Sequence, residues 1–314
     1  MNPLSALYGA AVRTRNELYD RGMLTVRRLE GPVVSIGNLT VGGSGKTPFL
    51  IMLGELLQQR GIAFDVLSRG YRRETQGVAI VKPNGAASEF GDEPLLISRK
   101  LGVHVIVGED RWQAGKLAEA RFGPQLHLLD DGFQHRQLAR DFDIVLVTPT
   151  DARDSLLPQG RLREPVASLA RADAVVLTND TSAEGLQLRN QLVWHVRRGI
   201  VTPETLEPWF AFCGIARPEN FFAQLEGTQV VLAGTRSFRD HHGYTEEDVH
   251  ELQGLRQQAG APAFVTTEKD AVNLGGHLQA LQPIHVARVR MELENAEAAL
   301  DAMLAAVERR RHTT

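Results

Sequence analysis

"VVSIGNLTVGGSGKTPFL", residues 33–50, runs from apolar residues through a glycine cluster to Lys46 and Thr47, where a helical pattern opens. Glycines let the backbone fold tightly enough for its N–H groups to point inward at phosphate oxygens, and the dipole of the following helix adds to the attraction. A strand, a glycine loop and a helix in this order are the setting that a phosphate-binding loop requires. The stretch therefore predicts a nucleoside triphosphate site in an α/β fold.

The residues of this loop have separate expected tasks. Lys46 is expected to contact the β- and γ-phosphates, and Thr47 to give its hydroxyl to Mg²⁺. The standard pattern begins with glycine, where this chain has Thr40. The nucleotide is predicted to be ATP or GTP. The predicted nucleotide-binding residues are Thr40, Val41, Gly42, Gly43, Ser44, Gly45, Lys46 and Thr47.

Short apolar segments alternate with helical patterns over the first two-thirds of the chain. Helical patterns lie between many of the apolar segments, as at 47–60 and 110–121. Such alternation implies right-handed crossovers and a mostly parallel sheet with helices on both faces, as in the nucleotide-binding class of α/β folds built on a phosphate loop. The strands are expected at 33–36, 63–67, 78–81, 104–107, 127–129, 143–147 and 174–178.

The pattern changes after about residue 185. Residues 187–202 are expected to form the strands of a connecting hairpin, and a second, shorter α/β run follows. A cleft between two such domains is a favoured place for a ligand. The run has strand-like segments at 210–215, 228–234, 262–270 and 283–289, with helices near 217–226 and from Thr245. The predicted parts are an N-terminal helix at 1–25, a phosphate-loop domain at 26–188 and a smaller α/β domain at 189–314.

Composition excludes several classes of protein. Hydrophobic residues make up 43% and charged residues 23% of 314, so the chain is an ordinary folded protein. The net charge of -3 gives no global basic field for non-specific nucleic-acid binding. The single cysteine, Cys213, can form neither an internal disulfide nor a structural zinc site, which fits a reducing compartment. No apolar run reaches the roughly 18 residues of a membrane span, and the first residues lack the charged-then-apolar-then-small layout expected of a secretion signal.

The N-terminal segment is amphipathic and basic. Arg13, Arg15 and Arg21 lie on other helical faces than its apolar residues. Such a helix can lie in a membrane interface and meet anionic lipid, and the alternative is a helix packed on its own domain. The apolar residues at helical spacing are Leu4, Leu7, Tyr8, Ala11, Leu18 and Tyr19.

Carboxylates for a metal follow another predicted strand. HLLDDGFQH, residues 127–135, places Asp130 and Asp131 directly after three apolar strand residues and before a glycine turn. One or both are expected to reach Mg²⁺ directly or through water, since that ion usually keeps several waters. The alternative is a solvated turn.

Two further stretches bear on what accepts the phosphate. GDEP, residues 91–94, puts Asp92 just ahead of an apolar helix, where a carboxylate also serves as a helix cap. RDHHGYT, residues 239–245, places His241 and His242 before another helix. Histidine is the side chain most easily tuned to move protons near neutral pH, although such a pair is also common on surfaces. Neither stretch decides the acceptor alone.

The combination of these motifs resembles the tetraacyldisaccharide 4'-kinase family of the lipid A pathway. DDGFQH joined to GGSGKTP is the most specific part of the resemblance, which extends from near the N-terminus to about residue 270. The motifs that carry it are GNLTVGGSGKTP (37–48), SRGY (68–71), GDEP (91–94), DDGFQHR (130–136), LPQGRLREP (157–165), FCGIARPENFF (212–222), DHHGYT (240–245) and TTEKD (266–270).

The resemblance implies transfer of the ATP γ-phosphate to the 4'-hydroxyl of a tetraacylated glucosamine disaccharide 1-phosphate. It implies a peripheral enzyme on the cytoplasmic face of a Gram-negative inner membrane, with Mg²⁺, an acylated lipid and the membrane surface as partners. No nucleic acid and no obligate protein partner are indicated. By motif, Asp92 matches the catalytic base and His241 its proton-relay partner; Lys46 acts in catalysis, and Asp130 and Asp131 match the metal-associated pair.

Other polar residues have weaker predicted roles in substrate binding. Arg69, Arg161 and Arg163 are candidates for the acceptor's 1-phosphate or the nucleotide phosphates, because a guanidinium suits phosphate oxygens. Glu164 is a candidate for orienting metal-bound waters. His135 either contacts substrate or orders the aspartate turn.

Two other functions compete with this interpretation. A regulatory or partitioning ATPase has a similar loop, but those proteins carry a lysine early in it, where this chain has Val41. A kinase or ligase for a small soluble substrate is the second alternative. ATP turnover that depends on the acyl disaccharide separates the lipid kinase from both.

Overall fold

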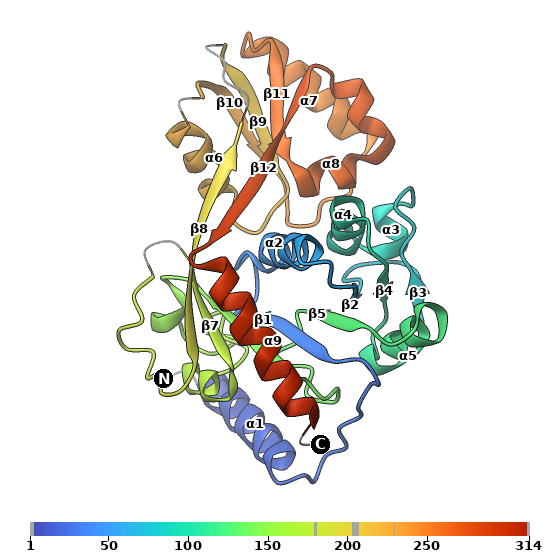
Figure 1. Ribbon diagram of the computed structural model, residues 1–314. Helices are drawn as coiled ribbons and strands as arrows, with labels where there is room; N and C mark the ends of the chain where they lie inside the picture. The colour runs from blue at the N-terminus through green and yellow to red at the C-terminus, as the bar shows by residue number, and fades with distance from the viewer. Residues whose placement is uncertain (1–2, 179–180, 203–206, 229, 313–314) are drawn as a thin grey trace.

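The computed structural model describes residues 3–178, 181–202, 207–228 and 230–312. Within them the chain forms two bodies that share one sheet of twelve strands (Figure 1). The strand order is β10-β9-β11-β12-β8-β7-β6-β1-β5-β2-β4-β3. No helix among the described residues is both long and apolar enough to cross a bilayer.

The larger body holds the N-terminal half of the sheet. Its strands are parallel except β3, which runs antiparallel to β4 at the edge. The strands are β1 (Val33–Asn38), β2 (Phe64–Ser68), β3 (Ala79–Ile80), β4 (Val105–Val107), β5 (Leu126–Asp130), β6 (Phe142–Val147) and β7 (Ala174–Thr178). The helices of this body are α1 (Pro3–Asp20), α2 (Lys46–Gln59), α3 (Ala87–Phe90), α4 (Asp92–Leu101) and α5 (Arg111–Phe122), with 3-10 turns η1 (Asp151–Arg153) and η2 (Val166–Arg171).

Helices cover this sheet on both faces. Phe49 and Leu53 of α2 pack with Val34 of β1 in one core, while Ala114 of α5 packs with Leu129 of β5 in another. Residues buried on both faces explain why the strands read as continuous apolar runs. The predicted fold class, a mostly parallel sheet with helices on both faces, is confirmed.

The smaller body is a second α/β unit. Its sheet is parallel in the order β10-β9-β11-β12, and helices pack on it from both sides. Residue 229 of the strand predicted at 228–234 lies outside the described residues. The elements are β9 (Trp209–Cys213), α6 (Pro218–Gly227), β10 (Leu232–Ser237), α7 (Glu246–Gln258), β11 (Ala263–Thr267), α8 (Glu268–Leu274) and η3 (Gly275–Leu281).

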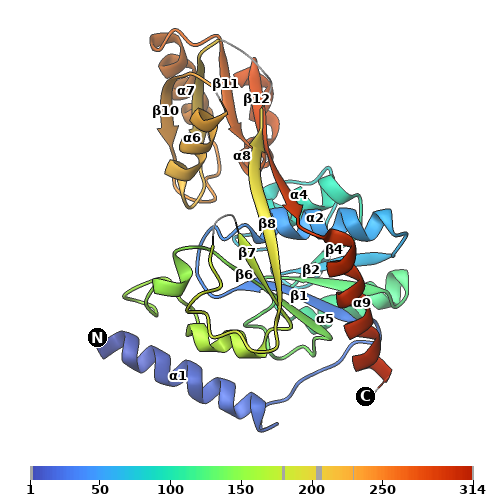
Figure 2. The same cartoon turned by 60° about the vertical axis from the view of Figure 1, so that its left-hand side comes forward.

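Two long antiparallel strands join the bodies (Figure 2). β8 (Leu192–Val201) runs parallel to β7 of the larger body, and β12 (Ile284–Leu293) runs parallel to β11 of the smaller one. The prediction that 187–202 alone forms the strands of a hairpin is therefore wrong. This segment forms one strand, because its antiparallel partner is β12, which lies far along the chain.

The C-terminal helix returns to the larger body. α9 (Ala296–His312) buries Leu300 and Met303 in the same core as Phe49 of α2. Arg310 reaches Asp173 at 2.8 Å near the start of β7. The residues after 295 therefore pack on the phosphate-loop body, and only the segment between β8 and β12 forms the smaller one (Figures 1 and 2).

Candidate active site

A cavity of about 1230 Å³ lies between the two bodies. The larger body contributes the loop before α2, the ends of β2 and β5 and the start of α4. The linker strands β8 and β12 form one wall, and the smaller body contributes residues 215–217, 240–241 and 267–269. The cavity is where the carboxyl ends of parallel strands meet a second domain, a favoured position for ligands in α/β proteins.

All eight residues predicted to bind nucleotide, 40–47, line this cavity. Gly45 precedes the first residue of α2 and has a φ of 84°, and Gly42 has a φ of 89°. Side-chain-bearing residues rarely adopt this left-handed backbone, so glycine is required at both turns. The chain thereby brings the first turn of α2, with its unpaired N–H groups, to the cavity wall.

Lys46 is held in place by two neighbours. Its Nζ donates to Oδ1 of Asn38 at 3.1 Å and lies 3.5 Å from Oδ1 of Asp131. Asn38 is the last residue of β1 and is fully buried. Sequence reasoning missed Asn38, although it stands two residues before the loop on a strand that leads into it.

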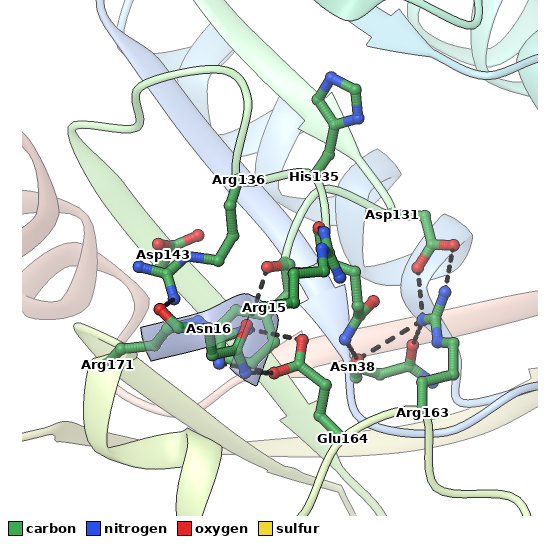
Figure 3. A network of polar contacts seen from close by, with 12 residues as sticks. Arg15, Asn16, Asn38, Asp131, His135, Arg136, Asp143, Arg163, Glu164 and Arg171 are labelled. Carbon is green, nitrogen blue, oxygen red and sulfur yellow. Dashed lines mark hydrogen bonds and ion pairs between the residues drawn. The ribbon is translucent and has the colours of Figure 1, made fainter. Parts of the chain in front are cut away.

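Asp131 forms a two-pronged ion pair with Arg163 (Figure 3). The two N···O distances are 2.7 and 2.8 Å, and Arg163 also donates to Asn38. Burial acts to raise the pKa of Asp131, but Lys46 and Arg163 outweigh it and hold that pKa below its ordinary value. Asp131 is therefore ionised, and it links the phosphate-loop lysine to Arg163.

Asp130 stands in a different environment. Its Oδ2 accepts from Oγ of Ser68 at 2.9 Å, while its Oδ1 is buried without a hydrogen-bond partner in the part of the chain that the structure describes. Burial, then the charges of Glu93 and Asp131, raise the pKa of Asp130 to about 7. A buried carboxylate oxygen without a partner beside a phosphate loop fits a divalent cation.

The surrounding donors suit Mg²⁺ in particular. Among the described residues, no group of three or more histidine, cysteine or acidic side chains converges on one point. Mg²⁺ needs only one or two carboxylates, because phosphate oxygens and water complete its shell. Thr47, whose hydroxyl-bearing side chain lines the same cavity, belongs to the predicted set with Asp130 and Asp131.

Asp92 meets His241 across the cavity. Asp92 is the first residue of α4 and is 5% exposed, and its Oδ2 lies 2.8 Å from Nδ1 of His241 in the smaller body. Asn273 of α8 donates to the same oxygen at 3.1 Å. Burial acts to raise the pKa of Asp92, but the hydrogen bond from His241 and the charge of Lys269 outweigh it and lower that pKa. The carboxylate therefore stays ionised at neutral pH.

The two adjacent histidines point to different partners. His241 faces Asp92, and its ring lies edge-on to Tyr71 with the centroids 5.2 Å apart. His242 instead places Nε2 3.0 Å from Asp248 at the start of α7 and stacks on Phe238. A φ of 57° at His241 turns the backbone so that the two rings diverge.

Sequence reasoning gave no role to Lys269, Asn273 or Asp240, which surround the Asp92–His241 contact. Lys269 lies in the motif TTEKD, which supported the family resemblance, but no residue of this motif was assigned a role. All three belong to the smaller body, so nothing in the local sequence connects them with Asp92.

The residues with weaker predictions divide into two groups. Arg69 and Arg163 line the cavity, whereas Arg161, His135 and Glu164 are not among its lining residues. Arg161 pairs with Asp154 at 3.1 Å, and burial lowers the pKa of His135 to about 4.

Glu164 is bound into a structural network. Arg171 donates to both of its oxygens at 2.8 Å, and Asn16 of α1 donates to one of them at 2.7 Å (Figure 3). The carboxylate is 1% exposed. It joins α1 to the loop that carries Arg163 and is not a lining residue of the cavity.

The N-terminal helix is both packed and partly exposed. Tyr8 donates to the backbone carbonyl of Arg163 at 3.0 Å, and Val12 is buried. Leu4 and Leu7, in contrast, are 61% and 69% exposed. α1 lies along the larger body at the end remote from the smaller one (Figure 2). The expected packing of this segment on its own domain therefore holds for part of the helix, and its binding to a membrane interface stays a prediction.

Comparisons with known proteins cover nearly the whole chain. A family model described as tetraacyldisaccharide-1-P 4'-kinase matches residues 1–308. A tetraacyldisaccharide 4'-kinase from Koribacter versatilis is 51% identical, covering 99% of each chain, and one from Geobacter metallireducens is 40% identical over 96% of each. A crystal structure of LpxK from Aquifex aeolicus in complex with ATP has a TM-score of 0.79 at 33% identity, covering 97% of each chain.

Proposed function

The chain belongs to the tetraacyldisaccharide-1-phosphate 4'-kinase family, and from this premise we propose how its residues carry out the reaction. It is a kinase of lipid A biosynthesis that transfers the γ-phosphate of ATP to the 4'-hydroxyl of a tetraacyldisaccharide 1-phosphate. The observation that carries the proposal is the 2.8 Å contact between Asp92 and His241 in the cavity that the phosphate loop lines. The residue roles below are our assignments.

The phosphate loop binds the donor. Backbone N–H groups of residues 42–47 surround the phosphates, with the first turn of α2 behind them. Lys46 reaches the β- and γ-phosphates from the position in which Asn38 and Asp131 hold its ammonium group. Because these partners fix the lysine before the nucleotide arrives, little side-chain entropy is lost on binding.

Thr47, Asp130 and Asp131 would hold Mg²⁺. When bound, the ion neutralises charge that builds up on the phosphate oxygens during transfer. Asp130 offers the buried oxygen without a partner, and Asp131 is oriented by Arg163. The positive charges of Lys46 and Arg163 remain beside the phosphates as the bond to the leaving ADP breaks.

Asp92 orients the acceptor and takes its proton. The 4'-oxygen forms a bond to the γ-phosphorus, the bond from that phosphorus to the β–γ bridging oxygen breaks, and ADP leaves with that electron pair. The proton of the hydroxyl passes to a carboxylate oxygen of Asp92. Because the pKa of Asp92 is lowered, transfer of the proton occurs late, once the new P–O bond has made the hydroxyl acidic.

His241 fixes the carboxylate and completes the site from the smaller body. Its Nδ1 lies within 3.0 Å of both oxygens of Asp92. Contact between the bodies excludes water from the γ-phosphate, which disfavours hydrolysis relative to transfer. We assign Arg69 and Arg163, which line the cavity, to phosphate groups of the acceptor or of ATP.

We assign the enzyme to the cytoplasmic face of the inner membrane as a peripheral protein. Support comes from the acylated acceptor, from the exposed leucines of α1 and from the arginines on its other faces. A single amphipathic helix gives reversible binding, which suits an enzyme that must release a lipid product into the bilayer.

The test is transfer of label to lipid. Purified protein is incubated with Mg²⁺, γ-labelled ATP and detergent-dispersed tetraacyldisaccharide 1-phosphate, and the lipid is then chromatographed. Label is expected in the lipid at the 4'-position, and it should depend on Asp92. Hydrolysis of ATP at an equal rate with and without the acceptor, with no labelled lipid, would contradict the proposal.

A further inference from the structure

The side chain of Lys269 lies at the centre of the contact between the two bodies. Lys269 is the second residue of α8, and its side chain is 16% exposed. Its Nζ lies 3.1 Å from Asp240, 3.5 Å from Glu93 and 3.7 Å from Asp92. One ammonium group thus faces three carboxylates, two from the larger body and one from the smaller.

The same ammonium also contacts the histidine of the site. Nζ of Lys269 lies 3.2 Å from Nε2 of His241. A protonated lysine has only hydrogens to offer and no lone pair, so a hydrogen bond between the two requires Nε2 to accept and to carry no hydrogen. Oδ2 of Asp240 also faces Nε2 but lies 3.7 Å away, beyond hydrogen-bond distance. The ring then holds its hydrogen on Nδ1, the atom that faces Asp92 at 2.8 Å. The contact therefore selects the tautomer of His241 that donates to Asp92.

The groups around Lys269 favour its protonated form. Burial acts to lower the pKa of Lys269, but the carboxylates of Glu93, Asp92 and Asp240 outweigh it and raise that pKa. Lysine is therefore a cation at neutral pH in this position, and it offsets repulsion among the three carboxylates.

We propose that Lys269 is a positioning residue for phosphoryl transfer, which fixes the Nδ1–H tautomer of His241 and holds Asp92 and His241 together across the interdomain contact. This inference rests on the roles proposed above for Asp92 and His241. Lys269 acts through these two residues, so its loss should affect the rate of transfer more than the binding of ATP.

A simpler role must be separated from this one. Lys100 of α4 forms an ion pair with Glu268 of α8, so it also joins the two bodies at the same helix pair. No contact joins Lys100 to Asp92 or His241 among the interactions of the described residues. If Lys269 only clamps the bodies together, Lys100→Met and Lys269→Met should have similar effects.

The experiment compares Lys269→Met, Lys269→Arg and Lys100→Met in the full chain. Steady-state kinetics give kcat and the KM for ATP, and ¹⁵N NMR of the imidazole of His241 reports which ring nitrogen carries hydrogen. Lys269→Met should lower kcat about 10- to 100-fold, by analogy with the residues that orient metal-ligating histidines, with the KM for ATP changed less than about 3-fold. Its His241 signals should move away from a single Nδ1–H tautomer.

The other two variants complete the comparison. Lys269→Arg keeps a cation and a donor at this position, so it should recover most of the kcat and the Nδ1–H signature. Lys100→Met should stay within about 3-fold of the parent kcat. If Lys269→Met fails to fold, Lys269→Leu replaces it, since leucine also removes both the charge and the hydrogen-bond donor.

An unchanged kcat and unchanged His241 signals in Lys269→Met would overturn the inference, as would an equal loss of kcat in Lys100→Met. Asp92→Asn, measured in parallel, separates a failure of the Lys269 inference from a failure of the proposed function. An inactive Asp92→Asn beside a fully active Lys269→Met leaves the proposed function in place and removes Lys269 from it. Full transfer by Asp92→Asn would overturn both.

Discussion

The two ends of the cavity are assembled in different ways. At the nucleotide end, Lys46 opens α2 after the loop that follows β1, and Asp130 and Asp131 stand at the end of the neighbouring β5. Their partners Asn38 and Arg163 belong to the same body. At the transfer end, Asp92 of the larger body meets His241 and Lys269 of the smaller one. The first end is complete within one domain, whereas the second exists only where two domains touch.

This difference implies that binding of ATP and transfer of phosphate are separable by mutation. Changes at the nucleotide end should alter affinity and rate together, because the same groups hold the phosphates in the ground state and the transition state. Changes at the transfer end should lower kcat alone. The smaller body reaches the larger one through β8 and β12, so the geometry of transfer also depends on this two-stranded connection.

The largest effect is expected for Asp92→Asn. An amide cannot accept the hydroxyl proton, and it removes the charge that faces His241 and Lys269. Labelled lipid should form about 10²- to 10⁴-fold more slowly, the range typical of general-base loss. Binding of ATP, measured by calorimetry, should be within about 3-fold of the parent protein, because no nucleotide contact is changed. A large loss of ATP affinity would show that the two ends are not independent.

Lys46→Met tests the opposite end. Removal of the ammonium that we assign to the phosphates should lower kcat/KM for ATP about 10²- to 10³-fold, the cost of losing one preorganised charge in such a site. The KM for ATP should rise as well, in contrast to Asp92→Asn. Lys82→Met, a substitution at a lysine outside the cavity's lining, is the matched control and should leave both constants unchanged. A normal KM for ATP in Lys46→Met would contradict the proposed division of the cavity into a nucleotide end and a transfer end.

The same division explains what the sequence could predict. The phosphate loop is eight consecutive residues, and the aspartates follow a strand directly, so local pattern and the parallel-sheet rules suffice to bring them together. Asp92 and His241 stand 149 positions apart, and only the family resemblance, not any periodicity, linked them. Lys269 was missed for this reason, since its partners lie on other elements.

Two further expectations depended on contacts that local sequence does not show. Residues 187–202 read as a hairpin because their apolar pattern suits strands, but the partner of β8 is β12. Glu164 follows Arg163 in the chain, yet its carboxylate faces Arg171 and Asn16. Arg163 and Glu164 are adjacent, yet only Arg163 lines the cavity, so a motif alone does not tell which of its residues faces a ligand.

When no cation is bound, the free energy of unfolding should depend on pH through Asp130 at the nucleotide end. The pKa of Asp130 is about 7 in the folded protein against an ordinary 3.8, so the folded state binds this proton more tightly than the unfolded one. The resulting stabilisation is full below the unfolded value and is lost as the pH rises through the folded value. Asp130→Asn stays uncharged and should lack this loss.

The measurement is the free energy of unfolding without nucleotide or Mg²⁺ at pH 5 and pH 8. Relative to Asp130→Asn, the parent protein should lose about 1–3 kcal/mol over this interval, since one pKa unit corresponds to roughly 1.4 kcal/mol. Mg²⁺ with ATP should reduce the difference. If the free energies of unfolding of the two proteins change equally with pH, the pKa of Asp130 is not raised in the folded protein.

The smallest effect should come from neither end of the cavity but from α1, the helix that we propose binds the membrane surface. Leu4→Ser with Leu7→Ser removes two exposed apolar side chains from α1 and no contact of the cavity. Sedimentation with vesicles that contain anionic lipid should show binding weakened about 3- to 10-fold, because each leucine enters the interface only partly. Val231→Ser, which changes an apolar residue on the smaller body that is 55% exposed, should leave vesicle binding unchanged. The KM for ATP should not move in either variant, since neither leucine lines the cavity and the contact of α1 with the Arg163 carbonyl is made by Tyr8, which both variants keep. A rise in the KM for ATP in the leucine variant would instead show that α1 helps to set the position of Arg163, and hence of Asp131, at the nucleotide end.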